Sequence, residues 1–97
     1  MYVIFSIAKE NTGKMNEALK DDLVSRQSIT IREAKVLGED MEGTFLLVDG
    51  TEEAVRRAKE IFEDIGEALS DDKAKSVYAK FKAEEDTVAG GVGALFG

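Results

Sequence analysis

The residues with the clearest potential for chemistry lie in a polar turn near the start of the chain. This turn covers residues 10–15, between seven residues of strand-forming type and a segment with helical periodicity. Backbone N–H groups at the start of a helix have no partner within the helix, so they favour a small anionic ligand. The structural alternative is that Asn11 or Thr12 caps the helix and that Gly13 supplies a turn with positive φ.

Carboxylates form the second group of candidate ligands. Acidic pairs recur along the chain, and Ca²⁺ and Mg²⁺ prefer carboxylate oxygens. No pair has the alternating spacing of an EF-hand loop. The best candidate is the loop with Glu39, Asp40 and Glu42, because a short turn brings three carboxylates together. A solvated acidic surface explains the pairs better, so we predict no metal site and keep divalent-cation binding as an alternative.

The sequence offers no catalytic constellation. Cysteine and histidine are both absent, which excludes disulfides and thiolate metal sites and removes the commonest general base. A serine, threonine or lysine nucleophile would need an activating neighbour, and no spacing indicates one. We therefore expect no enzyme activity, no catalytic residues and no cofactor.

The charge balance narrows the choice of partners. Of the 97 residues, 20 are acidic and 13 are basic, which gives a net charge of -7. Such a field repels nucleic acid and anionic membrane surfaces. No apolar run approaches the length of a membrane span, and the N-terminus lacks a signal-peptide pattern. We expect one cytoplasmic domain without a nucleic-acid or membrane partner.

Hydrophobic periodicity predicts the strands that position the turn. Strands are expected at residues 2–8, 28–37 and 44–48. In the second of these the apolar residues change phase, which predicts a bulge or bend near Arg32 and Glu33. The first and third are apolar on both faces, and a single layer of helices covers only one face of a sheet. The second face, with Tyr2 and Ile4, therefore needs another subunit or a packed tail to cover it, and we expect it to pair with another subunit in a homo-oligomer.

Two helices are predicted with the strands. The first covers residues 13–25, and the second begins after Thr51, its expected N-cap, and reaches about Gly66. Residues 74–84 fit a helix through Ala74, Val77, Tyr78 and Phe81, and they fit a strand by alternation. A fourth strand closes a β-α-β-β-α series most simply, so we predict a strand there.

These elements predict an α+β ferredoxin-like β-α-β-β-α-β sandwich, with a four-stranded antiparallel sheet and two helices on one face. Residues 1–86 are expected to form this single domain, and residues 87–97 a Gly-rich C-terminal tail. The tail is interpreted either as a frayed terminus or as an arm whose Val92, Leu95 and Phe96 dock on a neighbouring subunit.

The order of elements and the first turn resemble an ACT domain, a small β-α-β-β-α-β regulatory module. The family's first turn typically runs Asp-x-Pro-Gly-x-Leu, and the matching run here is Glu10-Asn11-Thr12-Gly13-Lys14-Met15. The glycine is retained, whereas Glu10, Thr12 and Met15 stand in place of the aspartate, proline and leucine. The likeness covers roughly residues 2–83.

The resemblance implies a binding role. Family members bind an amino acid or a similar small molecule at a subunit boundary, often through backbone amides of the first turn. The ligand-binding residues carried over are Glu10, Asn11, Thr12, Gly13 and Met15. We therefore predict a non-catalytic regulatory module for an amino-acid-like ligand, similar to a free-standing ACT domain. The alternative is an oligomeric assembly or partner-binding subunit without a small ligand.

Overall fold

The computed structural model describes the backbone of residues 1–96 and the side chains of residues 1–84. Its strands are β1 (Tyr2–Ile7), β2 (Ser28–Glu33), β3 (Thr44–Asp49) and β4 (Gly66–Ala68). Its helices are α1 (Thr12–Ala18), α2 (Glu52–Ile61) and α3 (Asp71–Phe96), with 3-10 turns at Lys9–Asn11 and Val24–Arg26. The strands form one antiparallel sheet in the order β2-β3-β1-β4. The predicted α+β class and four-stranded antiparallel sheet are confirmed.

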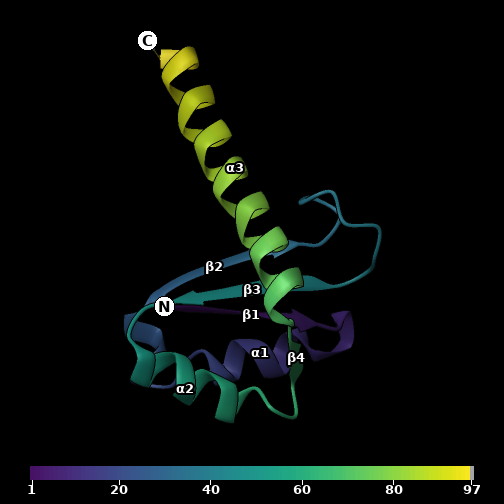
Figure 1. Ribbon diagram of the computed structural model, residues 1–97, viewed down its shortest axis with the longest axis vertical. Helices are drawn as coiled ribbons and strands as arrows, with labels where there is room; N and C mark the ends of the chain where they lie inside the picture. The colour runs from purple at the N-terminus through teal and green to yellow at the C-terminus, as the bar shows by residue number, and fades with distance from the viewer. Residues whose placement is uncertain (97) are drawn as a thin grey trace.

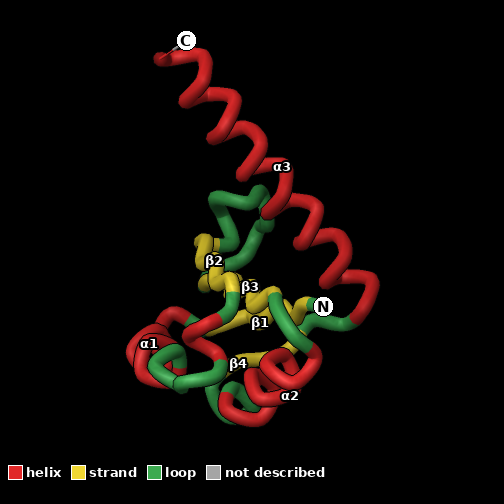
Figure 2. The backbone as a smooth tube through the Cα atoms, turned by 90° about the vertical axis from the view of Figure 1, so that its left-hand side faces the viewer, coloured by secondary structure: helices red, strands yellow, loops and turns green. Residues whose placement is uncertain are grey.

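The sheet lies between two layers of helices (Figures 1 and 2). On one face, Met15 of α1 and Val55 of α2 pack against Phe5 and the other inward residues of the central strands. On the opposite face, Val77 of α3 packs against Ile4 and other strand residues. The strands β1 and β3 occupy the two inner positions, which explains why both of their faces are apolar, as predicted.

The helix α2 begins as its sequence predicts. The hydroxyl oxygen of Thr51 accepts a hydrogen bond from the Ala54 backbone N–H at 3.1 Å, which confirms the expected N-cap. The helix α1 is shorter than predicted, because it ends at Ala18 and the chain continues through turns to Val24–Arg26. The strand β2 ends at Glu33, so its predicted continuation to residue 37 is wrong: the chain turns directly after Glu33, close to the predicted bend.

The predicted strand at residues 74–84 is wrong, because these residues belong to α3. Helical geometry places Val77, Tyr78 and Phe81 on one side, where Val77 and Phe81 are buried and the Tyr78 ring stacks on Tyr2 with centroids 4.1 Å apart. In a strand, Tyr78 would point away from the other two.

The fourth strand is instead the short segment β4, which pairs with β1. It begins at Gly66, where an added Cβ would lie 2.8 Å from the Ser6 carbonyl oxygen and 2.3 Å from Cδ1 of Ile7. Glycine therefore permits the close approach of this segment to β1. Three residues carry too little periodicity to be recognised as a strand in the sequence.

The sheet face predicted to pair with another subunit is covered by α3. Ile4 is fully buried there, and Tyr2 is half-buried against Tyr78. An uncovered sheet face therefore no longer argues for a homo-oligomer, and the homo-oligomer stays a prediction. The predicted docking of Val92, Leu95 and Phe96 lies outside the described side chains.

Candidate functional site

Strand pairing brings three separate segments to one corner of the sheet. In the register of β1 with β3, Ile7 lies opposite Thr44, so the turn after β1 sits beside the start of β3. In the register of β2 with β3, Glu33 also lies opposite Thr44. The polar turn predicted as the site therefore adjoins both ends of the loop that joins β2 to β3.

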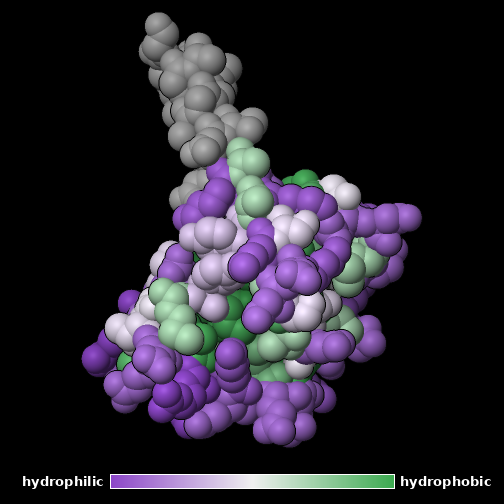
Figure 3. Space-filling model, in the orientation of Figure 1, coloured by the Kyte–Doolittle hydropathy of each residue, from purple (hydrophilic) through white to green (hydrophobic). Residues whose placement is uncertain are grey.

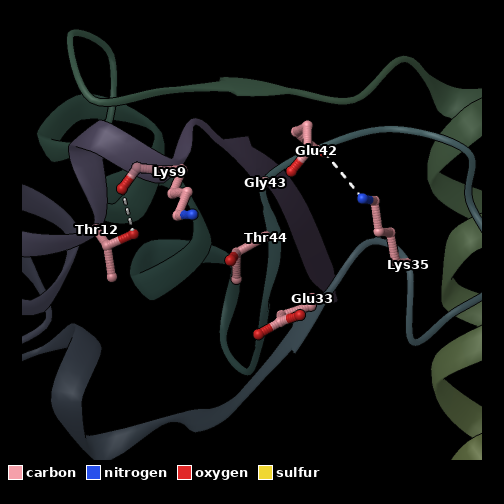
Figure 4. A pocket seen from close by; sticks show the side chains of 7 residues that line it. All are labelled: Lys9, Thr12, Glu33, Lys35, Glu42, Gly43 and Thr44. Carbon is pink, nitrogen blue, oxygen red and sulfur yellow. Dashed lines mark hydrogen bonds and ion pairs between the residues drawn. The ribbon is translucent and has the colours of Figure 1, made fainter.

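A pocket of about 300 Å³ opens at this corner. Two lysines, two glutamates, two threonines and a glycine line it, and we call it the corner pocket: Lys9, Thr12, Glu33, Lys35, Glu42, Gly43 and Thr44. Figure 4 shows Lys9 and Thr12 on one side, the pair of Lys35 and Glu42 on the other, and Glu33 and Thr44 between them. The formal charges of the lining cancel, in a chain whose net charge is -7.

One pair of charges in the corner pocket is already engaged. The Lys35 ammonium donates to a carboxylate oxygen of Glu42 at 2.9 Å. This hydrogen bond lowers the pKa of Glu42 and raises the pKa of Lys35 from their ordinary values. Both side chains are exposed, so a ligand can compete for either partner.

The other two charged groups are open to a ligand. Within the described side chains, residues 1–84, the Lys9 ammonium and the Glu33 carboxylate make no hydrogen bond or ion pair. The Thr12 hydroxyl donates to the Lys9 carbonyl oxygen at 2.8 Å, which fixes the threonine at the pocket wall. Lys9 still acts through space on Glu42, and Glu33 acts on Lys35. Over the part of the chain that the structure describes, the corner pocket thus offers one cation and one carboxylate without a hydrogen bond, beside one weakly held pair.

Of the five predicted ligand-binding residues, only Thr12 lines the corner pocket. Glu10 and Gly13 are exposed, Glu10 in the 3-10 turn and Gly13 inside α1. Met15 is 2% exposed and packs in the core between the sheet and the helices α1 and α2, so its side chain is not available to a ligand. Asn11 is half-buried and does not line the corner pocket.

The backbone of the turn differs from the expectation. The N–H groups of Asn11 and Thr12 donate to the carbonyl oxygens of Ala8 and Lys9, so they are used within the 3-10 turn. Asn11 makes no capping bond with its side chain, whose amide instead donates to the Ile65 carbonyl oxygen at 3.0 Å. The prediction that the Asn11 side chain caps the first helix is therefore wrong.

The expected positive φ at Gly13 is also wrong. Within residues 1–96, the glycines with positive φ are Gly38 and Gly43. A Cβ added to Gly13 would meet nothing within 4 Å, so the fold itself does not require glycine there.

The acidic loop between β2 and β3 does not gather its carboxylates. Glu39 turns toward α3, where it accepts hydrogen bonds from Lys73 and Lys80, while Glu42 pairs with Lys35. Over the described part of the chain, no group of three or more acidic, histidine or cysteine side chains is arranged to hold a metal ion.

Sequence reasoning missed most of the corner pocket. Lys9, Glu33, Lys35 and Thr44 come from three segments that form no local motif, and only the register of the strands brings them together. A prediction of strand pairing would have found them, because the end of β1 and the start of β3 must meet in an antiparallel pair.

The described surface is strongly polar. Figure 3 shows hydrophilic residues over most of one face, interrupted by a smaller apolar area near its centre. Over residues 1–84, the large apolar side chains that are exposed are Met1, Val36 and Met41. Within the same limits, no helix has both the length and the apolar character of a membrane span.

Comparisons of the chain with protein-family models, with curated proteins and with solved structures find no match. The geometry of the corner pocket therefore carries the functional argument alone.

Proposed function

We propose that the chain is a ferredoxin-like sandwich with an added C-terminal helix, and that it serves as a non-catalytic binding module for an amino-acid-like ligand. The sheet order supports the fold: β1 and β2 are both antiparallel to β3, which lies between them, so β1 and β2 run in the same direction. A helix between two such strands, with a third strand inserted, is the split β-α-β arrangement.

The observation that carries the proposed function is the balance of charges around the corner pocket. A ligand with only negative charge would meet the carboxylates of Glu33 and Glu42, and a purely cationic ligand would meet Lys9 and Lys35. A zwitterion satisfies both kinds of group. Its carboxylate binds Lys9, its ammonium binds Glu33, and the hydroxyl of Thr44 supplies a further polar contact.

The size of the corner pocket fits the same class of ligand. Its volume of about 300 Å³ lies at the lower end of the range of roughly 300–1,000 Å³ that is typical of small-molecule sites. This favours a single amino acid or a similar metabolite over a nucleotide or a peptide. The corner pocket adjoins the turn that resembles the ACT pattern, and Thr12 belongs to both. The proposed contacts with the ligand come from side chains.

A thermal-shift screen against the standard amino acids tests this proposal. A ligand that binds only the folded chain raises stability by about 2.7 kcal/mol at a hundredfold excess over its Kd, which is roughly 10–20 °C for a domain of this size. We expect one amino acid or a small group to raise the Tm. We also expect Lys9→Met to abolish the shift, because the ligand carboxylate loses its cation.

Lys14→Met is the matched control, since Lys14 is an exposed lysine nearby that does not line the corner pocket. This variant should retain the full shift. An equal loss in both variants would show that general electrostatics, rather than the corner pocket, holds the ligand. The absence of a shift from every amino acid would contradict the proposed function.

A further inference from the structure

The loop of residues 34–43 connects the corner pocket to α3. At its two ends the Ala34 N–H donates to the Gly43 carbonyl oxygen at 3.0 Å, and Lys35 pairs with Glu42 at 2.9 Å. Both side chains of that pair line the corner pocket. Figures 1 and 2 both show the loop between β2 and β3 lying beside α3.

The middle of the 34–43 loop is attached to α3 through Glu39. This carboxylate accepts hydrogen bonds from Lys73 and Lys80, which lie seven residues apart and hence two turns apart on one side of the helix. The Glu39 side chain is 10% exposed, so both ion pairs are shielded from solvent on the loop side. The Glu39 N–H also donates to the Ala34 carbonyl oxygen at 3.0 Å, which joins this attachment to the base of the loop.

The docking of α3 also includes polar contacts with the strands of the sheet. Arg32 of β2 pairs with Glu84 at 2.5 Å, and the Tyr78 hydroxyl donates to a carboxylate oxygen of Asp49 at 3.5 Å. The loop thus contributes two ion pairs to this docking, both through Glu39. Glu39 and Glu42 are separated by only two residues, so the attachment to α3 lies close along the chain to the corner pocket.

We propose that the 34–43 loop couples the corner pocket to α3, so that a ligand in the pocket tightens the docking of α3 on the sheet. A zwitterion that joins Lys9, in the turn after β1, to Glu33, at the end of β2, restrains the base of the 34–43 loop, which holds Glu39 in place for its two lysines. Coupling of this kind is reciprocal, so docking of α3 also favours the ligand. The ligand part rests on the proposed function, whereas the mechanical link between loop and helix does not.

Amide hydrogen exchange of the unliganded chain tests the mechanical link. Glu42→Gln removes the ion pair at the pocket end of the 34–43 loop, and we expect amides of α3 between Ala74 and Phe81 to exchange about twofold faster, as befits one exposed ion pair. Glu39→Gln, which breaks the attachment itself, should accelerate the same amides about fivefold. The amides of α2 serve as the internal reference and should not change.

Asp40→Asn is the matched control, because Asp40 is an exposed carboxylate of the same loop that does not line the corner pocket and, within residues 1–84, makes no ion pair. It should leave the exchange of α3 unchanged. Unchanged α3 rates in Glu42→Gln, or equal acceleration of α2 and α3, would overturn the coupling.

A second measurement separates this inference from the proposed function. With an amino acid that binds the wild-type chain, Glu39→Gln should weaken the affinity about fivefold, the lower end of typical couplings between sites. Asp40→Asn, in the same loop and exposed, should not weaken it. Equal affinities in wild type and Glu39→Gln overturn the ligand part of the coupling, while a wild-type chain that binds no amino acid contradicts the proposed function and leaves the exchange experiment decisive.

Discussion

Replacing Phe81 by alanine is expected to destabilise the fold by about 3–5 kcal/mol, the usual cost of removing a buried aromatic ring. Phe81 is 4% exposed and belongs to the core between α3 and the sheet, together with Ile4, Phe45 and Leu47. The loss of the ring leaves a cavity over the two central strands. Urea unfolding followed by far-UV circular dichroism measures the change.

Val36→Ala is the control for this measurement. Val36 is 60% exposed, so removing its two methyl groups at a site open to water should change stability by no more than about 0.5 kcal/mol. A cost below about 1 kcal/mol for Phe81→Ala would mean that α3 does not cover this face of the sheet. The face would then be free for the subunit contact that the sequence suggested.

The second large effect is expected at Gly43, where the loop enters β3. Gly43 has φ of 104°, and a Cβ added there would lie 2.7 Å from the Ile7 carbonyl oxygen. Gly43→Ala therefore combines left-handed backbone strain with a clash against backbone atoms, each costing about 1–3 kcal/mol. We expect a total loss of about 3 kcal/mol in thermal or urea unfolding.

Gly38→Ala separates the two contributions at Gly43. Gly38 has φ of 82° in the same loop, but a Cβ there would meet nothing within 4 Å. This variant should lose only the backbone part, about 1 kcal/mol. Equal losses in the two variants would show that the contact of Gly43 with β1 contributes nothing, and would weaken the placement of the loop beside β1 that forms the corner pocket.

The sequence was sufficient to predict the elements whose local hydrophobic pattern agrees with their packing in the fold. The segments β1 and β3 are apolar on both faces, and both are inner strands between two layers of helices. The helix α2 has its Thr51 cap and an apolar stripe that includes the buried residues Val55 and Ala58. In each case the propensity, the periodicity and the tertiary environment point to the same structure.

The prediction failed where two patterns competed. Residues 74–84 satisfy both a helix and a strand, and the choice was made from the number of strands that the fold needs. The edge of the sheet was taken by β4, which has one glycine and no large apolar residue. The pairing of β4 depends on close approach to β1 and not on side-chain burial, so the hydrophobic periodicity of β4 does not indicate a strand.

The candidate site was predictable only in part. The polar turn after β1 was identified because its residues are consecutive, and Thr12 does line the corner pocket. Lys9, Glu33 and Lys35 are brought together by the pairing of β1, β2 and β3, which is a property of the register. Local motifs cannot reveal a site that long-range pairing assembles.

Mapping of amide chemical shifts during titration with amino acids tests the central claim most directly. If a zwitterion binds the corner pocket, the shifts of Thr12, Lys35, Gly43 and Thr44 should move together with saturation, and the same titration of Lys9→Met should leave them unmoved. Saturable shifts confined to another part of the chain, or no saturable shift with any amino acid, would contradict the account.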